Sequence, residues 1–172
     1  MHRFDADWIY ELPAPARWQS EVARQALGGW QVAGVFNART GTPAIITQSG
    51  LTSRPDYVGG DPILHDSKKT GNYLNRSVFA LVPLGVGRNP IRGGTLGNGA
   101  IRGPGFWGMN LSLSKGFQLT EQMRFQIAAG MFNALNYTPY TGFTTGIQGA
   151  TFGQFTSHAG AREIELNARL TW

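Results

Sequence analysis

Few residues of this chain are of the types that carry chemistry, and they lie far apart. The three histidines, His2, His65 and His158, fall in separate regions, and there is no cysteine. The absence of cysteine rules out disulfides, thiolate metal sites and cysteine nucleophiles. The segment GGDPILHDSKK places Asp61 and Asp66 close to His65. Because imidazole and carboxylate groups bind metal ions, this segment is the one candidate metal site, although a polar surface loop would have the same composition.

The remaining patterns do not form a recognisable active site. The segment GGTLGNGAIRG could cradle an anion, but no strand is predicted before it and no helix after it, as a phosphate-binding loop requires. Neither G-x-S-x-G nor H-E-x-x-H occurs. Hydrolysis of glycosides would need two carboxylates brought together by folding, and no such pair stands out. We therefore expect no enzyme, no catalytic or cofactor-binding residue and no assigned metal ligand.

The composition favours β-structure with long irregular loops. Charged residues make up 15% of the 172 residues, below the quarter or so that is typical of globular domains, and there are 24 glycines and 12% aromatic residues. The net charge of +5 comes from 15 basic and 10 acidic residues. Only Lys68 and Lys69 are adjacent, so the basic residues form no cluster of the kind that binds nucleic acid. We expect a solvated surface and no nucleic-acid partner.

Five segments alternate apolar and polar residues with a period of two, which predicts strands with one apolar face. The strands are expected at about 2–12, 29–40, 105–118, 123–134 and 162–172. The side chains expected together on the lipid-facing side are Phe4, Trp8, Trp30, Val32, Phe36, Leu111, Leu113, Phe125, Ile127, Leu166 and Leu170. Strands of globular proteins usually have about 5–6 residues, whereas a tilted strand needs about 9–11 to cross a membrane. The length of these segments therefore favours membrane-spanning strands.

The connections between these segments alternate in length. Long stretches rich in Gly, Pro, Asn, Thr and Ser cover about residues 41–104 and 135–161. Successive antiparallel strands place alternate connections at opposite ends, so both long loops fall at the same end. Outer-membrane barrels have this asymmetry, with long extracellular loops and short periplasmic turns. The sequence thus predicts an all-β fold, an antiparallel meander of about five long strands with two long extracellular loops.

The alternation also assigns side chains to the lumen and to the membrane interfaces. The polar strand residues expected to face the lumen are Arg39, Asn110, Arg124, Gln126, Asn167 and Arg169. Each of them could contact a plug or a solute, or could simply be solvated wall. The aromatic residues expected near the interfaces are Tyr10, Trp30, Trp107, Phe117 and Trp172. The longest apolar run, VFALVPLGV, is far shorter than the roughly 18 residues of a transmembrane helix.

Several segments, in this order, resemble the C-terminal end of TonB-dependent outer-membrane receptors. They are GGWQVAGVFNARTGTP, NRSVFA, IRGPGFWGMNLSLSKGFQLTEQMRFQIAAGMFNALNYTPY, FGQFTS and the terminal REIELNARLTW. The closest resemblance is to the Oar-like subgroup common in soil acidobacteria, which carries an N-terminal carboxypeptidase-regulatory-like domain. The resemblance implies the C-terminal part of a transmembrane β-barrel in the outer membrane of a Gram-negative bacterium.

The resemblance also implies a function and a set of partners. Such receptors import a bulky nutrient, with energy delivered by TonB, through a barrel of about 22 strands that holds a plug. This chain matches only about the last five strands and shows neither signal peptide nor plug domain, so we expect a fragment that is not active alone. The implied partners are outer-membrane lipid, the rest of the barrel and plug of a parent receptor, TonB through N-terminal segments that this chain lacks, and a solute that the sequence does not identify.

In this family the last strand, ending on an aromatic residue, resembles the signal read by the barrel-assembly machinery. The residues that fall on this pattern are Leu166, Ala168, Leu170 and Trp172. An ordinary amphipathic terminal strand would show the same alternation, and the sequence leaves that reading open.

One other reading of the whole chain remains at this point. A soluble secreted β-sandwich with a lectin-like binding role would also have alternating strands, but it needs a second sheet, and the long loops offer no obvious strands for one.

An open five-stranded sheet in lipid would leave two unpaired edges, which would cost tens of kcal/mol at several kcal/mol per unpaired group. The chain is therefore expected to be a gene fragment, an oligomerising piece or a degraded reading frame.

Overall fold

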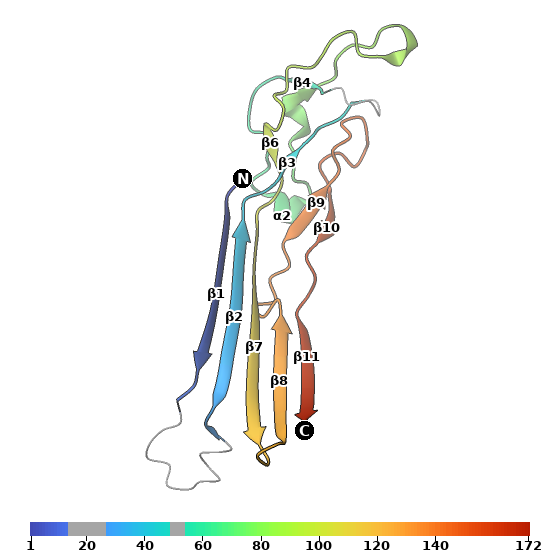
Figure 1. Cartoon of the computed structure of the whole chain (residues 1–172). Helices are drawn as coiled ribbons and strands as arrows, with labels where there is room; N and C mark the ends of the chain where they lie inside the picture. The colour runs from blue at the N-terminus through green and yellow to red at the C-terminus, as the bar shows by residue number, and fades with distance from the viewer. Residues whose placement is uncertain (14–26, 49–53) are drawn as a thin grey trace. The chain divides into compact units, whose positions relative to one another are not determined.

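The computed structural model describes residues 1–13, 27–48 and 54–172. The chain divides into two compact units, which are described separately (Figure 1). The sheet unit comprises residues 2–39, 107–138 and 160–172. The loop unit comprises residue 1 and residues 40–106 and 139–159.

The sheet unit is built on one five-stranded sheet in the order β1-β2-β7-β8-β11. Its strands are β1 (Arg3–Glu11), β2 (Trp30–Arg39), β7 (Phe106–Gln118), β8 (Arg124–Phe132) and β11 (Glu163–Thr171). The spatial order follows the chain order, and the pairings of β1 with β2, β7 with β8 and β8 with β11 are antiparallel (Figure 1). The predicted all-β meander of five long strands is confirmed.

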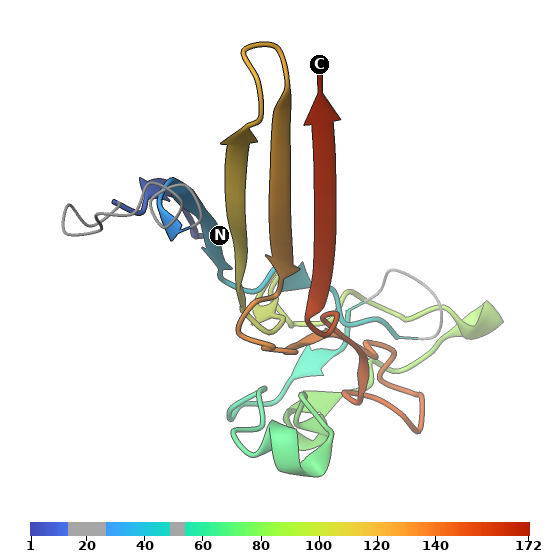
Figure 2. The same cartoon turned by 90° about the horizontal axis from the view of Figure 1, so that it is seen from below.

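The sheet is open and twisted. Figure 2 shows β1 and β2 strongly foreshortened, whereas β7, β8 and β11 run at full length in the plane of the picture. This rotation across the sheet is the twist that chirality gives to β-strands, and it is the starting point for closing a sheet into a barrel. β1 and β11 form the two edges of the sheet.

The strand register gathers the apolar side chains of neighbouring strands on one face, which we call the apolar face. Residues directly opposite each other in a pair point to the same side of a sheet. Tyr10 lies opposite Val32, and Ala129 lies opposite both Leu113 and Leu166. The predicted lipid-facing residues therefore fall in one phase on each strand. The opposite side, which carries most of the charges, is the polar face.

One glycine is required on the apolar face. Gly34 lies opposite Trp8, and a Cβ added to Gly34 would lie 2.1 Å from the nearest atom of the Trp8 ring. The indole therefore lies across β2 in space that any side chain at position 34 would occupy. This packing gives the edge strand β1 a broad contact with its neighbour.

The loop unit contains short elements in the segments that the sequence predicts to be irregular. Its strands are β3 (Pro43–Ala44), β4 (Asp56–Tyr57), β5 (Phe79–Ala80), β6 (Ile101–Arg102), β9 (Tyr140–Phe143) and β10 (Phe155–His158). Its helices are α2 (Ser67–Thr70), η1 (Arg76–Val78) and η2 (Val86–Arg88). The strands pair as β3 with β6, β4 with β5 and β9 with β10. Strands of two to four residues are too short to show a period of two, so the sequence pattern did not indicate them. No helix among the described residues is long and apolar enough to cross a membrane.

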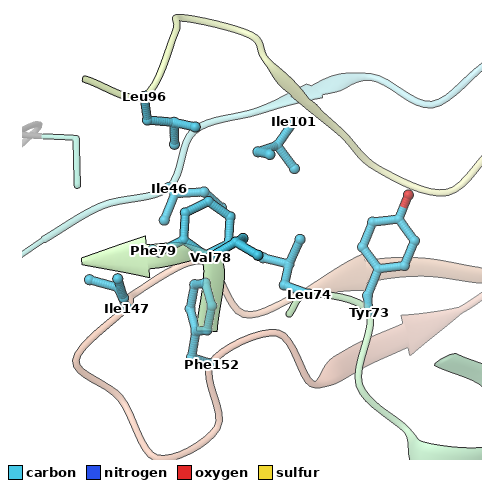
Figure 3. Packing of buried hydrophobic residues seen from close by; sticks show 9 residues of the cluster. All are labelled: Ile46, Tyr73, Leu74, Val78, Phe79, Leu96, Ile101, Ile147 and Phe152. Carbon is cyan, nitrogen blue, oxygen red and sulfur yellow. The ribbon is translucent and has the colours of Figure 1, made fainter. Parts of the chain in front are cut away.

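The buried hydrophobic residues of the described chain all lie in the loop unit, although the sequence points to the sheet as the apolar element. The cluster consists of Ile46, Tyr73, Leu74, Val78, Phe79, Leu96, Ile101, Ile147 and Phe152 (Figure 3). Phe79 meets Phe152 edge to face, with ring centroids 5.7 Å apart. The two long connections thus share one core, because Ile147 and Phe152 come from the second connection and the other seven residues come from the first.

Polar groups inside this core are paired. The side-chain amide of Gln48 donates to the carbonyl oxygen of Val82 at 2.6 Å and accepts from the Val82 N–H at 2.9 Å. The Tyr73 hydroxyl donates to the Arg102 carbonyl oxygen at 2.8 Å, and burial raises the pKa of Tyr73. Buried polar groups cost little when they are hydrogen-bonded, so these bonds help to give the loop unit a single packing.

Candidate functional site on the two faces of the sheet

A first aromatic row crosses the apolar face near the end of the sheet where β1 begins. It consists of Phe4, Phe36, Trp107 and Tyr137. The ring centroids of Phe4 and Phe36 are 6.2 Å apart, and those of Phe36 and Trp107 are 6.4 Å apart. Trp107 stacks on Tyr137 at 4.2 Å with an interplanar angle of 13°. The row therefore joins β1, β2, β7 and the segment after β8.

A second aromatic row lies at the other end of the same face, where Phe117 stacks on Phe125 at 6.2 Å. Trp30 belongs to this row, since the ammonium of Lys115 lies 5.5 Å from the centroid of the Trp30 ring and 5.0 Å from that of Phe117. Two further aromatic residues, Tyr10 and Trp172, lie at this end of their strands and are 56% and 86% exposed. All five predicted interfacial aromatics thus belong to one or the other end of the apolar face.

Lys115 is a residue that the sequence reasoning missed. It lies on the apolar face opposite Ile127, is only 3% exposed and donates a hydrogen bond to the Gly28 carbonyl oxygen. Its position continues the odd-numbered phase of β7 that runs through Leu113 to Phe117. That phase could have identified Lys115 as a cation among apolar side chains. Its ring contacts and its carbonyl partner compensate for placing a charge there.

The separation of the two aromatic rows fits the thickness of a membrane. Trp107 and Phe117 are ten residues apart on β7. At about 3.3 Å per residue they are about 33 Å apart along the strand, which the tilt of roughly 40° typical of barrel strands reduces to about 25 Å along the membrane normal. Outer-membrane barrels carry an apolar band about 25 Å tall between aromatic girdles.

An apolar hollow of about 440 Å³ lies between the rows. Its lining residues are Trp30, Leu113, Ile127, Ala128, Ala129, Leu166, Asn167 and Ala168. Ala129 and Ala168 have short side chains and lie among longer ones, which leaves the depression. Leu166 is 81% exposed, so this face is not covered within the sheet unit.

The predicted lumen-facing residues occupy the polar face, and the structure brings four of them together. Arg169 lies opposite Gln126, and Arg124 lies opposite Thr171 on the same strand pair. Asn167 lies opposite Ala128, one pair further along the polar face. The two remaining residues are separate from this group. Arg39 is at the far end of β2 opposite Arg3, and the Asn110 side chain accepts a hydrogen bond from the Asn133 N–H at 3.0 Å.

An asparagine-centred network holds the end of β8, and the sequence reasoning missed it. Asn133 has a positive φ of 48°, and its side-chain amide donates to the carbonyl oxygens of Tyr137 at 3.0 Å and Gly160 at 2.8 Å. Its side-chain oxygen accepts from the Tyr137 N–H at 3.0 Å. Asn136, with φ of 51°, accepts from the Arg162 N–H at 3.1 Å. The two asparagines of the segment FNALNYTPY therefore tie the exit of β8 to the entry of β11.

The candidate metal segment contains one exposed pair. The imidazole Nε2 of His65 lies 3.0 Å from an Asp61 carboxylate oxygen, and these side chains are 89% and 54% exposed. Asp66 precedes α2 and makes no capping hydrogen bond with its side chain. Within the described residues no three histidine or acidic side chains are grouped as metal ligands.

Comparisons with known proteins give one match. The family model described as "Outer membrane beta barrel domain" matches residues 1–165. The match spans β1, β2, β7, β8 and the first residues of β11. No curated protein and no solved structure matches the chain.

Proposed function

Because this chain belongs to the outer membrane beta barrel domain family, we propose that its five-stranded sheet is one section of the wall of a nutrient-import barrel. The chain is an outer-membrane protein. In the proposal the apolar face meets lipid and the polar face lines the lumen. The observation that carries this assignment is the pair of aromatic rows on the apolar face, about 25 Å apart along the expected membrane normal.

The proposal makes the sheet a section of a barrel because its edges need partners. β1 and β11 each have nine residues and no further strand beside them in the described sheet. About half of their backbone groups point outward, and each unpaired group in lipid costs several kcal/mol. The total is tens of kcal/mol, which exceeds the 5–15 kcal/mol by which proteins are typically stable. Single-chain bacterial barrels have 8 strands or more, so further strands must pair with both edges.

The finer part of the proposal is TonB-dependent uptake. The ordered segments that resemble the Oar-like receptors support it, together with the grouping of both long connections in one loop unit with its own core. The loop unit would face the outside and meet the nutrient first. A plug in the lumen would contact the polar face, and TonB would act through that plug. The proposal gives the chain no catalytic role.

The terminal strand has the features that the proposed assembly signal requires. Every residue of β11 is exposed, and Trp172 follows it directly. Leu166, Ala168 and Leu170 share the apolar face, opposite Ala129, Ile127 and Phe125. A strand with a free edge and an alternating apolar face offers the barrel-assembly machinery both backbone groups and a defined side-chain pattern.

No specific observation favours the β-sandwich alternative. A sandwich requires two sheets with buried inner faces. In the described residues the other sheets are two-stranded, with strands of two to four residues, which is too short to bury a face of the five-stranded sheet.

Single-cysteine labelling tests the wall assignment, because the chain has no cysteine of its own. We expect Leu166→Cys to be shielded from a water-soluble maleimide in outer membranes and to react with a lipid-soluble one. The adjacent Asn167→Cys, on the polar face, should show the opposite preference. A second matched pair, Leu113→Cys and Ser114→Cys on β7, checks that the result holds away from the edge. Equal labelling of neighbouring positions by both reagents would contradict the proposal.

A further inference from the structure

We infer that the polar face carries a binding site for the carboxylate or phosphate group of an anionic solute, formed by Arg124 and Arg169 with the polar residues around them. The inference rests on the proposed function, because it requires the polar face to line the lumen. It adds to that function the chemical class of the imported molecule.

The strand register places the two arginines beside each other. Arg124 lies opposite Thr171, and Arg169 lies opposite Gln126. The arginines are therefore diagonal neighbours on β8 and β11, with Cα atoms about 7–8 Å apart. On the other side of β8, Gln118 lies opposite Arg124. Two guanidinium groups, two amides and one hydroxyl, all able to donate hydrogen bonds, thus occupy one end of the polar face.

Within residues 1–13, 27–48 and 54–172, no carboxylate forms an ion pair with either arginine. Among the described residues, no ion pair or hydrogen bond involves the side chain of Arg124 or Arg169. Glu121, in the turn between β7 and β8, makes no ion pair with either arginine. Glu165 lies four residues from Arg169, about 13 Å away along β11. Two guanidinium groups on adjacent strands, at the distance of diagonal neighbours, can donate hydrogen bonds to one anion between them.

Gly116 determines how the Arg124 guanidinium lies. It is on β7 opposite Gln126, and a Cβ added there would lie 3.0 Å from Nη2 and 3.1 Å from Nε of Arg124. The edge of the guanidinium that carries Nε and Nη2 therefore faces the space above Gly116, which a side chain at position 116 would fill. This is the edge whose two N–H groups a carboxylate or phosphate can accept together, and glycine leaves room for the anion there.

The anion would reach this site along an open part of the wall. The polar face next to the arginines is formed by Ser114 on β7 and by Ala128 and Gly130 on β8. A Cβ added to Gly130 would meet no atom within 4 Å, so the space over Gly130 is open, and Glu165 lies opposite it on β11. Short side chains beside the two arginines leave room for the rest of a bulky solute.

The test uses the assembled barrel that contains this chain, purified from outer membranes in a neutral maltoside detergent. Inorganic pyrophosphate is followed by the width of its ³¹P resonance, and citrate labelled with ¹³C by the width of its ¹³C resonance, which separates phosphate from carboxylate recognition. We expect saturable broadening with at least one probe, and roughly tenfold weaker binding by the Arg124→Gln/Arg169→Gln variant. Gly116→Ala should also weaken binding, although the net charge is unchanged.

The matched control removes the same charge elsewhere. Lys68→Gln/Lys69→Gln, at two exposed positions of α2 in the loop unit, should bind both probes like the unmodified barrel. Equal weakening by the two double variants would show a net-charge effect and overturn the site, as would the absence of saturable binding. Cysteine labelling that alternates as expected, without anion binding, would refute the site alone. Labelling that does not alternate would refute the proposed wall.

Discussion

Lys115 is a cation on the apolar face, which meets hydrocarbon in the proposed function. Its ammonium lies over the rings of Trp30 and Phe117 and donates to the Gly28 carbonyl oxygen, at the end of β7 where an interface is expected. We expect Lys115→Glu to lower the free energy of unfolding of the assembled barrel by about 1–3 kcal/mol, because a carboxylate is repelled by ring faces and by the carbonyl. Urea titration in vesicles measures this loss.

The control for Lys115 is the next residue on the same strand. Ser114 lies on the polar face, so Ser114→Glu should change the free energy of unfolding by no more than about 0.5 kcal/mol. If both glutamate variants lost the same free energy, the two faces of β7 would have the same environment.

Asn133 combines an unusual backbone conformation with side-chain bonds. Its φ of 48° suits asparagine better than alanine, and its side chain bonds both backbone groups of Tyr137. Asn133→Ala should destabilise the barrel by about 2–4 kcal/mol, since it loses these bonds and strains the turn. Asn133→Gly should be roughly 1 kcal/mol less destabilising than Asn133→Ala, because glycine relieves the backbone strain but does not restore the hydrogen bonds. Hydrogen exchange of the Tyr137 amide, faster in both variants, reports the lost bonds, and unchanged exchange would disprove the role.

At the scale of elements, one carboxylate ties β4 to the segment that follows η2. The Asp56 carboxylate accepts from the Arg92 guanidinium at 2.6 and 2.8 Å and from the Thr95 N–H at 3.0 Å. The Arg92 hydrogen bonds, followed by the Thr95 bond, lower the pKa of Asp56 from 3.8 to about 2. A lowered pKa means that the link stabilises the folded loop unit above about pH 4 and is lost as the pH falls through about 2.

This pH dependence gives a prediction for the loop unit. Pepsin cleavage within residues 81–95 should accelerate as the pH falls from 4 to 2 in the unmodified protein, because the protonated Asp56 releases Arg92. The Asp56→Asn variant should be cleaved rapidly over that whole range. Its cleavage rate at each pH corrects for the pH dependence of pepsin itself. An acceleration of the same size in both proteins would mean that Asp56 does not control the segment.

The elements differ in how far the sequence could predict them. Long strands with one apolar face repeat a period of two, so the alternation of Leu111, Leu113 and Phe117 was sufficient to indicate β7. The core of the loop unit has no such period. Ile46, Phe79 and Ile147 come from distant positions and meet only after both long connections fold. The Arg124–Arg169 pair was placed on the correct strands, but its proximity depends on register, which single-strand patterns do not contain.

At the scale of the whole molecule, we expect the last residue to affect assembly of the barrel more than its stability. Trp172 is 86% exposed, whereas Phe36 contacts Phe4 and Trp107. We expect deletion of Trp172 to reduce the amount of barrel in the outer membrane far more than it reduces thermal stability, because an interfacial ring contributes only a few kcal/mol. Phe36→Ala should do the reverse. Outer-membrane abundance and melting temperature are measured side by side, and equal losses of abundance would rule out an assembly signal.

The direction of the edge strands limits how this wall can be completed. Both β1 and β11 run away from the end at which β1 begins, because the meander has an odd number of strands (Figure 1). If copies of the sheet were arranged around a common axis, β11 of one copy would lie beside β1 of the next copy. These two strands would be parallel, unlike the antiparallel pairs within the sheet. A barrel in which every neighbouring pair is antiparallel needs an odd number of further strands between β11 and β1. At least three further strands are needed to reach the smallest barrel of about eight. In the proposed barrel, copies of this sheet alone therefore cannot complete an all-antiparallel wall around a common axis.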